Sequence, residues 1–243
     1  MRRSGVSVGA GVGVGVCVLL AGCSPGHDST SYFPLAPGAR WTYSVQTDAD
    51  GAASRQQQTI SVLDERRYDG KPLFIRRSET PGNIGIEYWL RAQPDGIVRI
   101  AQRMDLEEFA ALDPAPRTVL KLPLAVGASW RAPTVPYTVM RKNEYPREVK
   151  YGRGMPMTYT VEALDEKLTV PAGSFAHCAR VVGRAEMTLF TDPVRGFNKV
   201  PVTTTEWYCR GVGLVKLERL EKLATPFYSG GSVLMELVEY RMP

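Results

Sequence analysis

The stretch Phe33-Pro34-Leu35-Ala36-Pro37-Gly38-Ala39-Arg40-Trp41 returns further along the chain as Leu122-Pro123-Leu124-Ala125-Val126-Gly127-Ala128-Ser129-Trp130. Proline, leucine, alanine, glycine, alanine and tryptophan keep their places in both copies. In each copy the Pro-Leu pair favours extended chain, the glycine permits a turn, and the tryptophan starts the next strand as a large core residue. We therefore expect both segments to be structural and not to contact a ligand.

Three further pairs of segments match in the same order along the chain: residues 63–66 with 164–167, 87–91 with 206–210, and 96–100 with 213–217. A collinear series of this kind indicates an internal repeat. We predict two copies of a unit of roughly five strands, at residues 32–102 and 121–220. A connector over 103–120 joins the two units, and a C-terminal strand lies within 221–243.

The residues after each match alternate between apolar and polar side chains, which is typical of half-buried strands. The first such run has Trp41, Tyr43 and Val45 on one face, and turn pairs such as Asp69-Gly70 and Asp95-Gly96 separate later runs. We predict an all-β fold, an antiparallel twisted sheet or half-barrel. One short helix is expected in the connector, because Asp105 could cap it and Glu108 follows three residues later. Leu106 and Phe109 would share a face of this helix.

The N-terminus has the layout of an export signal. Arg2 and Arg3 precede an uncharged run over residues 5–20, and Leu20-Ala21-Gly22-Cys23 resembles the lipobox of bacterial lipoproteins. The alternative is a transmembrane helix, but glycines dilute the apolar run and Ser24-Pro25-Gly26 breaks it. We predict a signal peptide over 1–22, lipidation of Cys23, a tether over 23–31 and a β domain over 32–243. The resemblance implies an anchored envelope protein, on the outer membrane and facing the periplasm.

Two cysteines remain after Cys17 is removed and Cys23 is lipidated, in a compartment where disulfides persist. In an antiparallel hairpin the numbers of paired residues share one sum. The midpoint between Cys178 and Cys209 falls within the turn-forming segment 191–196, so the two would face each other across neighbouring strands. We predict a disulfide, with two free thiols as the alternative. Because Cys178 falls on the polar face of its strand, the bond is expected on the outside of the sheet.

The charge balance argues against a nucleic-acid partner. Removal of Arg2 and Arg3 with the signal leaves 28 basic and 25 acidic side chains, a net charge of +3. The segment 141–153 is locally basic, with five basic and two acidic residues. We interpret it as a solvated loop, and the alternative is a contact with anionic lipid headgroups.

The sequence contains no recognisable catalytic set. Its two histidines are His27, in the tether, and His177, whose strand places it on the face opposite to Cys178. The acidic residues Asp105, Glu107 and Glu108 are interpreted as a solvated turn, and metal-ligand or nucleotide-binding motifs are not found. We predict that the protein is not an enzyme, with no catalytic, cofactor-binding or metal-ligating residue and no cofactor.

Three motifs together resemble a group of uncharacterised β-rich bacterial lipoproteins. They are Phe33-Pro34-Leu35 with Gly38 and Trp41-Thr42-Tyr43; Thr169-Val170-Pro171-Ala172-Gly173-Ser174-Phe175 with Cys178; and Gly211-Val212-Gly213-Leu214-Val215-Lys216. The resemblance implies a twisted antiparallel sheet or half-barrel in the periplasm. It implies no activity and no catalytic residues.

Three functions are then open. The first is a lipid-anchored protein that binds a protein partner or acts as a scaffold, without chemistry. The second is a carrier or acceptor of lipid or another apolar ligand, similar to half-barrel lipoprotein-sorting proteins; a fully packed interior would count against it. The third, ranked last, is a hydrolase that uses carboxylates alone, which requires a pocket lined by two of them.

Overall fold

The computed structural model describes residues 28–143, 147–149, 154–194 and 196–243. The predicted signal peptide, Cys23, His27 and most of the tether lie outside these ranges. Within them the chain forms β-strands and no helix. The strands are β1 Arg40–Ala49, β2 Ala52–Tyr68, β3 Lys71–Glu79, β4 Ile86–Gln93, β5 Gly96–Met104, β6 Ala111–Lys121, β7 Ser129–Thr134, β8 Met140–Arg141, β9 Met155–Val170, β10 Gly173–Asp192, β11 Gly196–Cys209, β12 Gly213–Ala224 and β13 Tyr228–Arg241.

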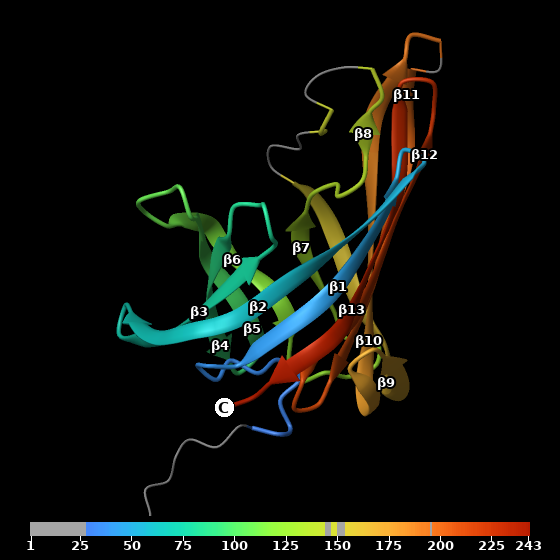
Figure 1. Cartoon of the computed structure of the whole chain (residues 1–243). Coiled ribbons are helices and arrows are strands. Elements are labelled where there is room, and N and C mark those ends of the chain that lie inside the picture. The colour runs from blue at the N-terminus through green and yellow to red at the C-terminus, as the bar shows by residue number, and fades with distance from the viewer. Residues whose placement is uncertain (1–27, 144–146, 150–153, 195) are drawn as a thin grey trace, which may run out of the picture.

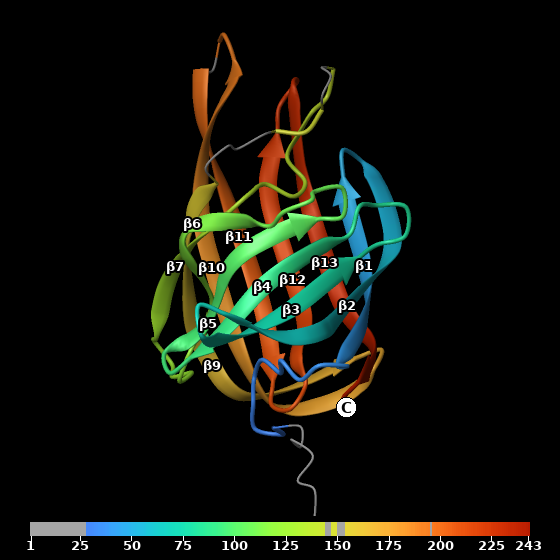
Figure 2. The same ribbon diagram turned by 90° about the vertical axis from the view of Figure 1, so that its left-hand side faces the viewer.

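The strands form one antiparallel sheet in the order β6-β5-β4-β3-β2-β1-β13-β12-β11-β10-β9-β7, and β8 pairs with β13. The sheet therefore consists of two six-stranded meanders, β1–β6 and β7 with β9–β13, which join through β1 and β13. The sheet curls on itself, as Figures 1 and 2 show. The prediction of an all-β half-barrel is confirmed.

The edge strands β6 and β7 approach each other without a ladder of backbone hydrogen bonds between them. Lys121 on β6 donates from its side chain to the carbonyl of Ser129 on β7, over 3.2 Å. Both edges contain proline, Pro114 and Pro116 on β6 and Pro133 on β7. A proline has no N–H to donate, so these strands are suited to edges.

The predicted connector helix is wrong. Residues 105–110 form turns and bends between β5 and β6. The Asp105 carboxylate does not cap a helix; it accepts two bonds of 2.7 Å from Arg77 and one of 3.2 Å from the Gly85 amide. Leu106 and Phe109 are 81% and 77% exposed, so an apolar helical face would have had no core to cover. The predicted connector range also contains most of β6, the sixth strand of the first meander.

The two repeated segments at 33–41 and 122–130 have the same backbone hydrogen bonds. Gly38 donates to the Val62 carbonyl and Gly127 to the Val161 carbonyl, each over 2.8 Å. Both glycines have a positive φ, 90° and 86°, which other residues rarely adopt. Each turn leads into a strand whose second residue is a buried tryptophan. The two segments thus have the same local structure. That the two whole units are equivalent stays a prediction.

The predicted disulfide between Cys178 and Cys209 is present, and the two residues pair directly across β10 and β11. Its predicted place on the outer face is wrong. The cysteines are 0% and 1% exposed and pack in a core with Trp41 and Val215. Irregularities in the pairing of β10 with β9 flank Cys178, and His177 has φ of 56°, so the simple alternation of faces does not hold here.

Replacing Cys178 and Cys209 by serine is expected to lower the free energy of unfolding by about 2–4 kcal/mol, because the bond closes a loop in the unfolded chain. The sequence separation is 31 residues. Urea unfolding followed by tryptophan fluorescence measures the change. The wild-type chain in reducing agent serves as the control and should lose a similar amount. An unchanged midpoint would contradict the prediction.

Candidate functional site: the cavity of the half-barrel

A cavity of about 530 Å³ lies inside the curled sheet, and both meanders contribute to its wall. This volume is in the range of pockets that hold one small ligand. One part of the wall is apolar, and includes Val45, Ile60, Leu217, Val233 and Met235. Another part is polar and aromatic, and includes Phe33, Arg76, Tyr88, Arg99, Arg117, Tyr137, Tyr159, Glu206 and Tyr208. The wall is therefore amphiphilic.

Strand β3 shows how the sequence places these residues. Leu73 and Ile75 are buried in a small core with Val98 and Ile100. Successive side chains of a strand point to opposite faces, so Arg76 and Ser78 point the other way, into the cavity. The curl of the sheet turns this polar face into an inner wall.

The chain closes one end of the cavity with the segment that leads into β1. Phe33 lines the cavity and packs on Tyr208, with 6.3 Å between ring centroids. The Gly211 amide donates to the Ser31 carbonyl over 2.8 Å, and a Cβ on Gly211 would lie 2.9 Å from the Ser29 carbonyl oxygen. This close approach requires glycine. The segment crosses the lower end of the half-barrel in Figures 1 and 2.

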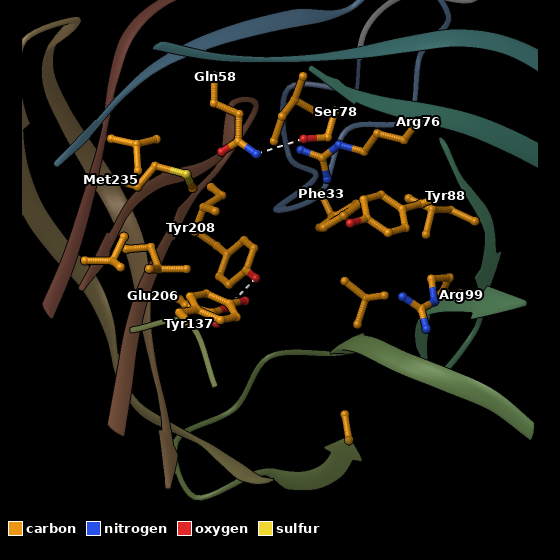
Figure 3. Close-up of a pocket in the computed structure, with 18 of the residues that line it drawn as sticks. Phe33, Gln58, Arg76, Ser78, Tyr88, Arg99, Tyr137, Glu206, Tyr208 and Met235 are labelled. Carbon is orange, nitrogen blue, oxygen red and sulfur yellow. Dashed lines mark hydrogen bonds between the residues drawn. The ribbon is translucent and has the colours of Figure 1, made fainter. Parts of the chain in front are cut away.

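Arg76 packs against aromatic rings. Its guanidinium carbon lies 4.6 Å from the ring centroid of Phe33 and 4.9 Å from that of Trp41. Its Nε is buried and has no hydrogen-bond partner. Burial lowers the pKa of Arg76, while the nearby Tyr43, Tyr208 and Tyr88 oppose that effect. Figure 3 shows the side chain on the cavity wall beside Phe33 and Tyr88.

Glu206 and Tyr208 form a pair on β11. The Tyr208 hydroxyl donates to Glu206 Oε2 over 2.6 Å, as Figure 3 shows. Burial raises the pKa of Glu206, although the bond from Tyr208 and the charges of Arg219 and Arg117 act against the rise. Glu206 is the one carboxylate in the cavity wall as far as the structure describes the chain. The described wall of this cavity therefore lacks the second carboxylate that the predicted hydrolase alternative requires.

The other two arginines of the wall differ from each other. Arg99 forms a two-point ion pair with Asp113, with bonds of 2.8 and 2.7 Å. Arg117 has no acidic side chain within ion-pair distance among the described residues, and the same holds for Arg76. The wall thus carries two guanidinium groups that form no ion pair among the described residues.

A buried ion pair holds the loop that carries Tyr137 against the cavity. Glu221 accepts hydrogen bonds from the backbone amides of Tyr137, Thr138 and Val139, at 2.7–3.0 Å. Arg219 donates to Glu221 over 2.7 Å, and its guanidinium carbon lies 3.9 Å from the Tyr137 ring centroid. Both charged side chains are almost fully buried. The pair positions Tyr137 as part of the wall.

Replacing Glu206 by glutamine is expected to raise the free energy of unfolding at neutral pH. Because its pKa is raised in the folded state, the wild-type residue supports full stability below the ordinary glutamate pKa and loses it as pH rises through the raised value. Glutamine keeps an acceptor for Tyr208 and does not ionise. Urea unfolding across pH 4–8 measures the difference between the two proteins. A variant that is less stable at neutral pH would contradict the expectation.

The residues singled out from the sequence lie away from this cavity or outside the described ranges. His177 is exposed and its Nδ1 lies 3.0 Å from Asp165. The Met104 amide donates to the Glu107 carboxylate over 2.8 Å, within the turn that also contains Asp105 and Glu108. Part of the basic segment 141–153 is described, and there Arg147 pairs with Asp50. Phe33, Arg76, Arg117 and Glu206 were not predicted as site residues, although Phe33 belongs to a quoted motif.

Two negative findings concern the described residues. They contain no group of three or more His, Cys, Asp or Glu side chains that could hold a metal ion. Among their elements, no helix has the length and apolarity required to cross a membrane.

Comparison with known proteins gives two solved structures of similar shape. One is a protein from Bacteroides fragilis described as exported and with a YmcC-like fold, 14% identical, with a TM-score of 0.48; the match covers 86% of this chain and 98% of that chain. The other is a protein from Parabacteroides distasonis described as a lipoprotein, 15% identical, with a TM-score of 0.44; the match covers 87% and 99%. No family model and no curated protein matches the chain. The functional proposal therefore rests on the cavity.

Proposed function

We propose that the protein is a lipid-anchored, non-catalytic lipoprotein of the bacterial envelope that binds one amphiphilic ligand inside its half-barrel. The observation that carries this proposal is the cavity of about 530 Å³ between the two meanders. A fully packed interior would have counted against a carrier, and the interior is not fully packed. Pockets of this size and mixed lining are where proteins hold small apolar or amphiphilic molecules.

The apolar part of the wall supports the same function. Val233 and Met235 on β13 and Leu217 on β12 line the cavity. Figure 3 shows Met235 across the cavity from Arg76 and Arg99. Each Å² of apolar surface withdrawn from water contributes about 25 cal/mol. An apolar chain bound in the cavity would withdraw both its own surface and that of the wall from water, and both contributions would stabilise the complex.

The location in the envelope rests on the lipobox and is supported by the disulfide. Cysteines that form a bond between neighbouring strands are expected in an oxidising compartment. The described chain begins at the same end of the half-barrel as the C-terminus, as Figures 1 and 2 show. A lipid on Cys23 would hold this end toward the membrane, and we place the protein on the outer membrane, facing the periplasm.

A protein partner is the second candidate function. The hairpin of β10 and β11 extends beyond the rest of the sheet in Figure 1. Near its tip, Phe190 and Phe197 pack edge to face, with 5.3 Å between ring centroids, and both are exposed. Exposed aromatic side chains of this kind are common at protein interfaces.

The carrier function is tested on the full chain with Cys23→Ser, purified from the periplasm without detergent. Native mass spectrometry is expected to show a co-purified apolar molecule. After its extraction, the neutral dye N-phenyl-1-naphthylamine is expected to bind saturably with enhanced fluorescence. Thr118→Trp, which fills the cavity, should weaken dye binding, whereas Thr188→Trp, on the exposed part of β10, should not. A bare mass together with no saturable dye binding would contradict the proposal.

A further inference from the structure

We propose that the cavity recognises an anionic head group at Arg76, with Arg117 as a second contact, so that the ligand is a single-chain amphiphile with a carboxylate or phosphate head. This inference rests on the proposed carrier function and specifies the class of ligand. It starts from the two wall arginines that have no acidic side chain within ion-pair distance among the described residues.

The environment of Arg76 suits a residue that binds an anion. A cation that is withdrawn from water is unfavourable unless it gains a counter-charge or hydrogen-bond acceptors. The rings of Phe33 and Trp41 provide cation–π contacts, which compensate in part. They accept no hydrogen bond from the buried Nε, which is left without a partner. A carboxylate or phosphate would supply both the charge and the acceptors, and a guanidinium can bind either through two parallel bonds.

The remaining charges of the cavity favour an anion too. Arg99 is already neutralised by Asp113. The charge of Arg117 acts on Glu206 from a distance, but Glu206 forms no ion pair with Arg76 or Arg117 among the described residues, and its Oε2 already accepts a bond of 2.6 Å from Tyr208. The Arg99 guanidinium carbon lies 5.6 Å from the Tyr88 ring centroid, and Arg76 lies beside Tyr88 in Figure 3. Arg117 lines the same cavity. The positive charge is therefore gathered at the wall formed by β3 to β6.

The apolar wall gives the ligand its orientation. In Figure 3, Arg76, Tyr88 and Arg99 lie on one side of the cavity and Met235 lies on the other. A head group held at Arg76 would direct an acyl chain toward Ile60, Val233 and Met235. A free small anion would leave this apolar surface uncovered, which is why the proposal specifies an amphiphile.

The test uses the full chain with Cys23→Ser after extraction of bound lipid, and measures displacement of N-phenyl-1-naphthylamine. The competitors are dodecanoate, dodecyl phosphate, dodecanol, acetate and inorganic phosphate. Dodecanoate or dodecyl phosphate is expected to compete at least about tenfold better than dodecanol, since a charged hydrogen bond contributes that much or more. The better of the two anions identifies the head group.

The matched variants are Arg76→Met, Arg117→Met and, as a control, Arg131→Met on the exposed face of β7. Arg76→Met is expected to weaken the anionic competitors by about 10-fold to 100-fold and to leave dodecanol unchanged. Arg117→Met should have a smaller effect of the same kind, and Arg131→Met none. Thermal unfolding followed by circular dichroism checks that each variant is folded.

The outcomes separate this inference from the carrier function. Equal competition by dodecanol and the anions in the wild-type chain overturns the head-group site and leaves the carrier function standing; this arm needs no variant. Displacement of the dye by acetate or inorganic phosphate alone also overturns it, in favour of a site for small anions. Absence of dye binding contradicts the carrier function itself.

Discussion

Replacing Trp41 by alanine is expected to lower the free energy of unfolding by about 3–5 kcal/mol, the usual loss for a large buried aromatic residue. Trp41 is 1% exposed and packs in the core that contains the disulfide. Its Nε1 donates to the Val212 carbonyl over 2.7 Å, and its ring lies 4.9 Å from the guanidinium carbon of Arg76. The variant leaves a cavity, removes the side-chain donor to the Val212 carbonyl and removes one of the rings that contact Arg76.

The equivalent residue of the second repeated segment provides the comparison. Trp130 is 9% exposed and stacks on Tyr159 with 5.4 Å between ring centroids. Its Nε1 has no hydrogen-bond partner among the described residues. Trp130→Ala is expected to fall at the lower end of the same range, about 3 kcal/mol. Urea unfolding followed by far-ultraviolet circular dichroism measures both variants. A loss near zero for Trp41→Ala, or a larger loss for Trp130→Ala, would refute this ranking.

Replacing Glu221 by alanine is expected to lower the free energy of unfolding by about 3–5 kcal/mol, because it breaks a buried ion pair on one side only. Arg219 would remain buried without its partner, and three backbone amides at residues 137–139 would lose their acceptor. Glu218→Ala is the control: Glu218 is half exposed, pairs with Lys216 and should lose less than about 1 kcal/mol. A similar loss in both variants would show that the buried network contributes no special stability.

The pH dependence at Glu221 is opposite in sign to that at Glu206. Burial raises the pKa of Glu221, but Arg219 and the amides of Thr138 and Tyr137 outweigh burial, so the net pKa is lowered. Its contribution is therefore complete above the ordinary glutamate pKa and is lost as pH falls toward the lowered value. Glu221→Gln should accordingly be closest to wild type in acid, and Glu206→Gln should exceed wild type at neutral pH.

The strands and the disulfide were accessible from the sequence because both depend on local patterns. Period-two alternation identifies β1, and the turn at 191–196 fixes the register that pairs Cys178 with Cys209. Alternation does not reveal which face of a strand becomes the inside of a curled sheet. Arg76 has the sequence pattern of a solvent-facing residue, yet it lines the cavity. A local irregularity, like those beside Cys178, also shifts faces without a clear signal in the sequence.

The ion pair on β12 is a second feature that the sequence pattern does not predict. The face that starts with Val215 and Leu217 continues with Arg219 and Glu221, while Leu220 is exposed. A sequence pattern favours leucine inside and the charged residues outside. The arrangement arises because a loop more than 80 residues earlier in the sequence donates backbone hydrogen bonds to Glu221. A local sequence pattern cannot predict that contact. The candidate site was missed for the same reason, since its residues come from strands of both meanders.

The two open edges of the sheet have a consequence for behaviour at high concentration. An unpaired strand normally offers its N–H and C=O groups to any neighbouring molecule and so promotes association into fibres. Here β6 and β7 face each other, and Pro114, Pro116 and Pro133 remove three of the donors. Because each edge strand lies against the other, a strand of another molecule has little access to either. We therefore expect the incompletely closed sheet to resist self-association through its edges.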